Sequence, residues 1–136
     1  MLSEIDLIEE LPGPDEYRAL RLAAGLSPKT SEAAERGLPA SLFGVCLRVD
    51  GRLIGMGRIV GDGGCNYEVV DVAVHPDFQR RGLGSTIMES LMGYLRDNAP
   101  ESAYVSLLAD GGAPALYEKF GFRRTAPTSV GMALKI

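Results

Sequence analysis

The sequence predicts an α+β fold with a mixed, mostly antiparallel sheet of about six to seven strands, flanked by about four helices. A hairpin is the first observation behind this fold class. The strand patterns Phe43–Val49 and residues 52–60 are joined by Asp50-Gly51, and an Asp-Gly pair between two strand patterns indicates a two-residue hairpin turn. Residues 65–74 then supply a third strand, so we expect three antiparallel strands in succession.

The second observation is a buried strand followed by a long amphipathic helix. Residues 69–74 are almost continuously apolar and rich in β-branched side chains, which is typical of a strand covered on both faces. Residues 83–95 place leucine and isoleucine at four-residue spacing, as on one face of a helix. A further strand pattern, 103–108, follows this helix. The strands at 69–74 and 103–108 should therefore lie parallel.

The remaining elements complete a single domain over residues 1–136. We expect a first strand over residues 3–10, helices over 15–24, 32–36 and 114–119, a short strand beginning at Phe122, and a last strand over 130–136. The last strand could end the sheet of its own chain or join the sheet of a neighbour. A homodimer is therefore a possible assembly.

Composition excludes several classes of function. The chain has 14 basic and 18 acidic residues and a net charge of −4, which argues against general binding of nucleic acid. No apolar run reaches membrane-spanning length, and the N-terminus lacks the features of a signal peptide. Cys46 and Cys65 have no metal-type spacing, so we expect two buried, reduced thiols, no metal site and a cytoplasmic location.

A glycine-containing loop, residues 79–85, precedes the long helix. The first N–H groups of a helix have no intrahelical partner, and the helix dipole favours anions there. Gly82 and Gly84 allow close approach to the backbone, and Arg80 and Arg81 add positive charge. The loop therefore predicts a phosphate site; the alternative is a glycine-containing turn with two solvated arginines. Ile87 replaces the third glycine of a dinucleotide fingerprint, and the lysine of a P-loop is missing.

Two motifs resemble the GNAT superfamily of acyl-CoA-dependent N-acetyltransferases. Val72-Ala73-Val74-His75-Pro76 followed by Gln79-Arg80-Arg81-Gly82-Leu83-Gly84 is similar to the acetyl-CoA motif of that family. Downstream, Ala115-Leu116-Tyr117-Glu118-Lys119-Phe120-Gly121-Phe122 resembles its A-L-Y-x-K-x-G-F signature. The resemblance covers residues 43–122 and implies a GNAT-like fold in which a splayed strand pair forms the CoA cleft.

The resemblance implies acetyl-CoA as co-substrate and assigns it a set of binding residues. The pantetheine arm would pair with the backbone of Val72 and Val74, and an N–H near Ala73 would face the thioester oxygen. The pyrophosphate would meet the N–H groups of residues 81–85. Asp110 stands where the family often has asparagine, so its contact is open. The full set is Val72, Ala73, Val74, Gln79, Arg80, Arg81, Gly82, Leu83, Gly84, Ser85, Asp110 and Tyr117.

The same resemblance assigns two catalytic roles. Tyr117 would donate a proton to the departing thiolate, and the alternative is an aromatic packed on the core. Glu68 matches the catalytic glutamate of the histone-acetylating branch, with a solvated strand residue as the alternative. Asp71 and Asp62 are other candidate bases or amine-binding carboxylates. His75, at a strand end before proline, is interpreted as surface structure.

These expectations describe an N-acetyltransferase that moves the acetyl group of acetyl-CoA to a primary amine by direct attack in a ternary complex. The acceptor is a small-molecule amine or a protein amine, and the acidic residues favour a small cationic amine. A non-catalytic acetyl-CoA sensor is the alternative, and a domain whose glycine loop is only a turn is a third. The expected partners include neither nucleic acid nor membrane.

Overall fold

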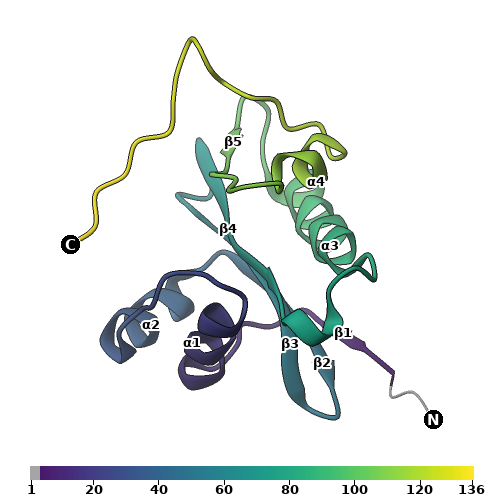
Figure 1. Cartoon of the computed structure of the whole chain (residues 1–136). Coiled ribbons are helices and arrows are strands. Elements are labelled where there is room, and N and C mark those ends of the chain that lie inside the picture. The colour runs from purple at the N-terminus through teal and green to yellow at the C-terminus, as the bar shows by residue number, and fades with distance from the viewer. Residues whose placement is uncertain (1–3) are drawn as a thin grey trace.

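A five-stranded sheet in the order β1-β2-β3-β4-β5 runs through the computed structural model, which describes residues 4–136 (Figure 1). Its strands are β1 (Asp6–Ile8), β2 (Phe43–Val49), β3 (Arg52–Gly61), β4 (Asn66–Val74) and β5 (Tyr104–Ser106). The first three pairs are antiparallel and β4 pairs with β5 in parallel, as the crossover helix predicted. Ser3, where the first strand was expected to begin, lies outside the described residues.

Two helices cover each face of the sheet (Figure 1). On one face, α1 (Pro14–Ala23) and α2 (Ser31–Gly37) enclose a cluster that includes Tyr17, Leu20 and Met56. On the other face, α3 (Leu83–Asn98) and α4 (Pro114–Glu118) cover a larger cluster. Short 3₁₀ turns, η1 (Leu38–Ala40) and η2 (Pro76–Phe78), precede β2 and follow β4. Of the helices that the structure describes, none has the length and apolar character needed to cross a membrane.

Helix α3 packs closely on the sheet because β3 has a glycine, which carries no side chain, where the helix contacts it. Ile87 and Leu91 of α3 are fully buried. A Cβ atom at Gly57 of β3 would lie 2.6 Å from Cγ2 of Ile87, a separation that real Cβ atoms do not adopt. Glycine therefore lets the helix and the strand approach, as expected for a strand glycine that serves close packing.

A bulge in β4 changes the direction of the strand at its centre. Met56 pairs with Ala73 and Arg58 pairs with Val70, so Asp71 and Val72 together lie opposite Gly57 alone. Asp71 has a left-handed φ of 58°. The β4–β5 pairing begins at Asn66 opposite Tyr104 and ends at Glu68 opposite Ser106. Beyond Glu68 the two strands part, which matches the splayed pair that the resemblance implied.

The sheet has fewer strands than the six to seven expected. Residues 122–136 contain no strand, and Val130, Met132, Leu134 and Ile136 are 65%, 88%, 86% and 115% exposed. Their alternating apolar pattern is that of a strand, but a strand needs a neighbour for its backbone groups, and this segment pairs with no strand among the described residues 4–136. The prediction for Cys65 was also wrong: it lies exposed in the turn before β4, whereas Cys46 of β2 is buried.

Candidate functional site

The N-terminus of α3 presents a row of unused backbone donors. Gly82 is the N-cap residue with a left-handed φ of 75°, and Arg80 has a φ of 64°. The first bond of the helix runs from Thr86 N–H to the carbonyl of Gly82 (3.2 Å). Within residues 4–136, no protein acceptor receives a hydrogen bond from the N–H groups of residues 81–85. Free N–H groups at the positive end of a 16-residue helix are a geometry suited to binding an anion.

The two glycines of this loop serve different purposes. The left-handed φ of Gly82 is a conformation that glycine adopts without steric cost. Gly84 lies inside the first turn of α3, where a Cβ atom would be 3.2 Å from Cδ2 of Leu116 in α4. Gly84 therefore also allows α4 to pack beside α3. This packing places the helix that carries Tyr117 next to the candidate phosphate loop.

The side chains of the loop connect it to the end of β4. Nε2 of Gln79 donates a hydrogen bond to the carbonyl of Val74 (2.9 Å). The guanidinium of Arg81 lies 5.3 Å above the ring of Phe78, and that of Arg80 is exposed to solvent. These contacts bring the predicted phosphate loop and the predicted pantetheine strand together. They also occupy the Val74 carbonyl, one of the backbone groups expected to pair with the cofactor.

The edge of β4 beyond Glu68 is the second part of the site. Val72 and Val74 pack on the α3 side of the sheet, and Ala73 is buried on the α1 side. Because β5 has separated from β4 at this point, an extended chain can add to the free backbone edge as a further strand. The backbone edge of β4 at residues 72–74 therefore has no strand of β5 beside it.

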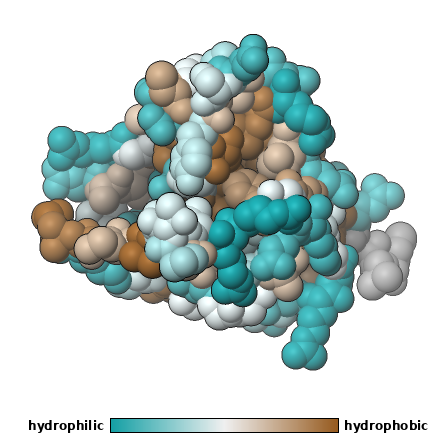
Figure 2. All heavy atoms as spheres, turned by 90° about the horizontal axis from the view of Figure 1, so that it is seen from above, coloured by the Kyte–Doolittle hydropathy of each residue, from teal (hydrophilic) through white to brown (hydrophobic). Residues whose placement is uncertain are grey.

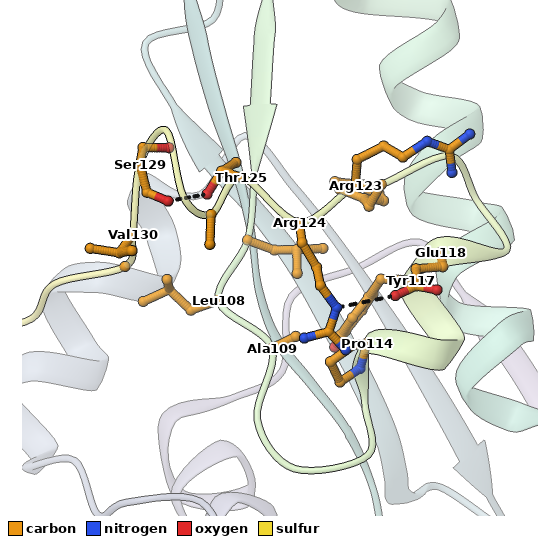
Figure 3. A pocket seen from close by; sticks show the side chains of 14 residues that line it. Leu108, Ala109, Pro114, Tyr117, Glu118, Arg123, Arg124, Thr125, Ser129 and Val130 are labelled. Carbon is orange, nitrogen blue, oxygen red and sulfur yellow. Dashed lines mark hydrogen bonds and ion pairs between the residues drawn. The ribbon is translucent and has the colours of Figure 1, made fainter.

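Tyr117 lines a cavity of about 280 Å³ between α4, the segment after β5 and the C-terminal region (Figure 3). Its ring meets Phe122 edge to face, with centroids 6.3 Å apart. Burial raises the pKa of the Tyr117 phenol above its ordinary value, and the negative charge of Asp110 adds to this effect. The phenol therefore remains protonated near neutral pH. Its hydroxyl has no hydrogen-bond partner in the part of the chain that the structure describes.

Glu68 occupies the fork at which β4 and β5 separate. It pairs with Val60 of β3 on one side and with Ser106 of β5 on the other. Its side chain is exposed and makes no ion pair with any described residue. An exposed carboxylate at the fork is accessible to a ligand that enters between the strands.

Asp71 lies at the centre of a buried polar cluster that sequence analysis did not find. Its carboxylate accepts hydrogen bonds from the Tyr17 hydroxyl (2.7 Å), Nη1 of Arg21 (2.5 Å) and Nε of Arg58 (2.6 Å). The Asp71 side chain is only 9% exposed. With three donors already bound, Asp71 is not free to act as a base or to bind an amine. Burial and then the hydrogen bond to Asp71 raise the pKa of Tyr17, so this phenol also remains neutral.

A small cavity of about 160 Å³ lies beside this cluster, between α1, α2 and β3. Tyr17, Lys29 and Arg58 supply its polar lining, and Ala34 and Leu38 supply part of the apolar lining. Nη1 of Arg58 donates to the hydroxyl of Ser41 (2.9 Å), which holds the guanidinium beside the cavity. The only sequence signal for the cluster was the i, i+4 spacing of Tyr17 and Arg21 on one face of α1.

Three other residues that the sequence suggested for the site form hydrogen bonds within their own turns. Oδ1 of Asp62 accepts N–H bonds from Gly64, Cys65 and Asn66, which lower its pKa and fold the turn before β4. Nδ1 of His75 accepts the Asp77 N–H (3.1 Å) and caps η2, in agreement with the interpretation as surface structure. The carbonyl of Asp110 accepts the N–H of Ala113, and its side chain is exposed.

Known proteins resemble this chain both in sequence and in fold. Over 81 residues the chain is 37% identical to an uncharacterized N-acetyltransferase of Porphyra purpurea. That alignment covers 60% of this chain and 45% of the relative, so the chain spans about half the length of this curated relative.

Among solved structures, a protein of unknown function from meticillin-resistant Staphylococcus aureus, described as a probable acetyltransferase, is 50% identical with a TM-score of 0.94. The match covers 98% of this chain and 100% of that one. A GNAT family acetyltransferase from Brucella melitensis, solved in complex with acetyl-CoA, is 22% identical with a TM-score of 0.65 over 90% of this chain and 85% of that one, and shares the fold. The sequence profile of the acetyltransferase (GNAT) family matches residues 7–122, and with the fold and the splayed strands described above this shows that the chain belongs to that family.

Proposed function

We propose that the chain is an N-acetyltransferase that transfers the acetyl group of acetyl-CoA to a primary amine by direct attack in a ternary complex. The observation that carries this proposal is the row of free N–H groups at residues 81–85, next to the unpaired edge of β4. Membership of the GNAT family supports it. The Brucella melitensis relative was solved with acetyl-CoA, and the same fold is present here.

The backbone would provide most of the cofactor contacts. The N–H groups of residues 81–85 would bind the diphosphate, with added positive charge from Arg80 and Arg81. The backbone at Val72 and Val74 would pair with the pantetheine amides, leaving Gln79 on the Val74 carbonyl. An N–H near Ala73 would face the thioester oxygen, where negative charge develops during attack. Acetyl-CoA supplies the activated acetyl group, and these residues hold and orient it.

Tyr117 would complete the departure of the thiolate. The amine nitrogen attacks the carbonyl carbon, the carbon–sulfur bond breaks, the nitrogen releases its extra proton to water, and the sulfur takes the proton of the Tyr117 hydroxyl. A phenol whose pKa is raised by burial is reliably protonated before the reaction, and its hydroxyl makes no hydrogen bond within the described chain. Both properties suit a proton donor, and the phenolate regains its proton from solvent after the product leaves.

The acceptor must reach the site as a neutral amine. A lysine-like amine near pKa 10.4 costs about 4.6 kcal/mol to deprotonate at pH 7, whereas an α-amino group costs only about 1–1.4 kcal/mol. Glu68 is the proposed base, acting through water at the fork of β4 and β5. It is exposed in the chain alone, so this role requires that the bound substrates cover it and raise its proton affinity.

The preference for a small cationic acceptor rests on Glu68. Asp62 is committed to the turn before β4, and Asp71 is neutralised by two arginines. Of the three carboxylates that suggested a cationic amine, only Glu68 is exposed with a side chain that makes no ion pair or hydrogen bond to the described residues. A protein amine remains the second acceptor class, and an amine panel distinguishes the two.

Replacement of Tyr117 by phenylalanine tests the mechanism. Turnover, followed by release of free CoA thiol, should fall about 100-fold or more, while the dissociation constant of CoA stays within about twofold. Tyr94→Phe is the matched control, because Tyr94 lies on α3 and stacks on Phe43 away from the site. Unchanged turnover in Tyr117→Phe would remove this residue from the mechanism. Silence of the native protein across a broad amine panel, with CoA still bound, would favour a non-catalytic sensor.

A further inference from the structure

The buried polar cluster around Asp71 carries more positive than negative charge. Arg21 and Arg58 both bind the Asp71 carboxylate, and both arginine side chains are largely buried. Neither guanidinium forms an ion pair with any other carboxylate of the described residues. The third donor, the Tyr17 hydroxyl, is neutral. One positive charge is therefore left without a matching anion, and a buried charge without a partner is costly.

This surplus charge faces the cavity of about 160 Å³ that Tyr17, Lys29 and Arg58 line, which we call the cationic cavity. Nε of Arg58 donates to Asp71 and Nη1 donates to Ser41, so part of the five-donor guanidinium fork is left for a ligand. Lys29 adds a second cation, and its side chain forms no ion pair with the described residues. None of the described residues that line the cavity is acidic. The cavity therefore offers charge and donors to an anion.

Local bonds hold the loop that carries Lys29 beside the cationic cavity. Nε of Arg18 on α1 donates to the carbonyl of Lys29 (2.8 Å), and its Nη1 donates to the hydroxyl of Ser31 (2.9 Å) at the start of α2. On α2, Glu32 pairs with Arg36 (3.3 Å), and both side chains are highly exposed. Glu32 is therefore not a counter-ion for the cavity, and the charge of Lys29 remains available.

The cationic cavity has room for a small anionic group. Ala33, Ala34 and Gly37 of α2 lie along it and leave space. Its volume of about 160 Å³ equals that of about five water molecules, enough for a carboxylate and a few carbon atoms. Figure 2 shows a hollow of different character, with apolar atoms exposed inside it. A carboxylate in an apolar hollow would lose its hydration without gaining partners. An anion is therefore better matched by the cationic cavity.

Glu68 lies on the same face of the sheet as Arg58. Val70 of β4 pairs directly with Arg58 of β3, and Glu68 lies two residues before Val70. Such diagonal neighbours on adjacent strands are about 7–8 Å apart. Tyr67 and Val69, on either side of Glu68, belong to the cluster on the α3 face, so Glu68 points to the α1 and α2 face. A small molecule with an amine at one end and a carboxylate at the other therefore meets opposite charge at both ends.

We propose that the acceptor is a small amine of the amino-acid class, whose carboxylate is bound by Arg58 and Lys29 while its amine faces Glu68. This inference rests on the proposed function and narrows its acceptor class. In the transfer the nitrogen bonds to the acetyl carbon and loses a proton through water, the carbon–sulfur bond breaks, and the sulfur gains a proton. The products are the N-acetylated amino acid and CoA. Arg58 and Lys29 exchange no proton; they position the acceptor and select for its carboxylate.

A paired acceptor panel is the first test. α- and ω-amino acids are assayed beside their amides by release of free CoA thiol. Amidation removes the carboxylate charge and increases the fraction of neutral amine, so a preference for the acid cannot arise from amine protonation. For the best acceptor, kcat/KM should be at least about tenfold higher for the acid than for the amide. Amides used as well as acids overturn this inference and leave the transferase function intact, whereas silence with every amine overturns both.

Reversal of the charge at Lys29 tests the cavity itself. Lys29 is exposed, so Lys29→Glu should fold, which circular dichroism confirms. KM for the acid should rise at least about tenfold, while kcat/KM for the amide stays within about twofold. Arg36→Gln is the matched control, because it removes a cation from the exposed face of α2 outside the cavity, and it should change neither value.

Inhibition by a carboxylic acid that has no amine gives a second readout of the same contact. Butyrate should compete with the acceptor in the native chain, and its inhibition constant should rise at least about tenfold in Lys29→Glu. Arg58→Lys keeps a cation beside Asp71 but loses the guanidinium fork, and it should raise KM for acids without raising KM for amides. Equal losses for acids and amides in both variants, or an unchanged preference in both, would overturn the assignment of the carboxylate to this cavity.

Discussion

Substitution of Asp71 by asparagine tests the polar cluster that holds the β4 bulge against α1. The change removes the charge and keeps the shape of the side chain. Asparagine adopts left-handed φ more readily than most residues, so the φ of 58° at this position adds little cost of its own. The measured effect therefore reports the loss of the carboxylate.

The expected magnitude follows from burial and partners. Two guanidinium groups bind the Asp71 carboxylate, and the side chains of Arg21 and Arg58 are only 7% and 17% exposed. Removing one partner of a buried ion pair costs about 3–5 kcal/mol, because the remaining charge stays buried without compensation. The free energy of unfolding should therefore fall by about 3 kcal/mol or more, which is a large part of the stability of a domain of this size.

Urea unfolding followed by circular dichroism measures this loss, provided that the slope of free energy against urea stays unchanged. Glu68→Gln is the matched control: it removes a carboxylate from the same strand, three positions away, that is exposed and makes no ion pair within the described chain. It should change the free energy of unfolding by about 0.5 kcal/mol at most. A loss below about 1 kcal/mol in Asp71→Asn would refute the argument that the cluster depends on this charge.

Two further predictions concern groups outside the site. Cys65 is exposed, whereas burial raises the pKa of the Cys46 thiol to about 12, so one thiol per chain should react rapidly with an aromatic disulfide reagent. Cys65→Ser should abolish the rapid phase, and two rapid thiols would contradict the burial of Cys46. The hydrogen bond from Arg48 holds the pKa of Glu16 below its ordinary value of 4.5. Because the pKa of Glu16 is lowered in the folded state, the native chain should be more stable than Glu16→Gln, and this difference should be at its full size above pH 4.5. The difference should shrink as the pH falls through the pKa of Glu16 in the folded state. A difference that stays constant down to about pH 2 would contradict this.

Local chemistry accounts for the parts of the fold that the sequence predicted well. Asp50 and Gly51 have φ values of 50° and 81°, as a tight hairpin turn requires, and their identities alone indicate that turn. The apolar stripe of α3 is similarly visible as a repeat of four residues, and it is buried on the sheet. The parallel pairing of β4 with β5 follows from the crossover between them. Each of these features depends on neighbours in the sequence.

The features that sequence analysis missed depend on distant contacts. Asp71 looks like any strand carboxylate until the fold brings Tyr17, 54 residues away, within hydrogen-bonding distance. The glycines before Cys65 indicated that the turn ends before this residue, so Cys65 was predicted to lie in a strand. In the structure the turn before β4 extends one residue further and includes Cys65. The apolar alternation of residues 130–136 predicted a strand that the structure does not contain, because alternation alone does not supply the neighbouring strand that the backbone needs.

The central claim is that the free N–H groups where α3 begins bind the diphosphate of CoA while the splayed edge of β4 receives the pantetheine arm. A crystal structure of the chain with CoA tests it most directly. We expect diphosphate oxygens within about 2.7–3.2 Å of backbone nitrogens between residues 81 and 85, beside Gly82 and Gly84. A diphosphate bound elsewhere, with those N–H groups facing only water, would contradict the account.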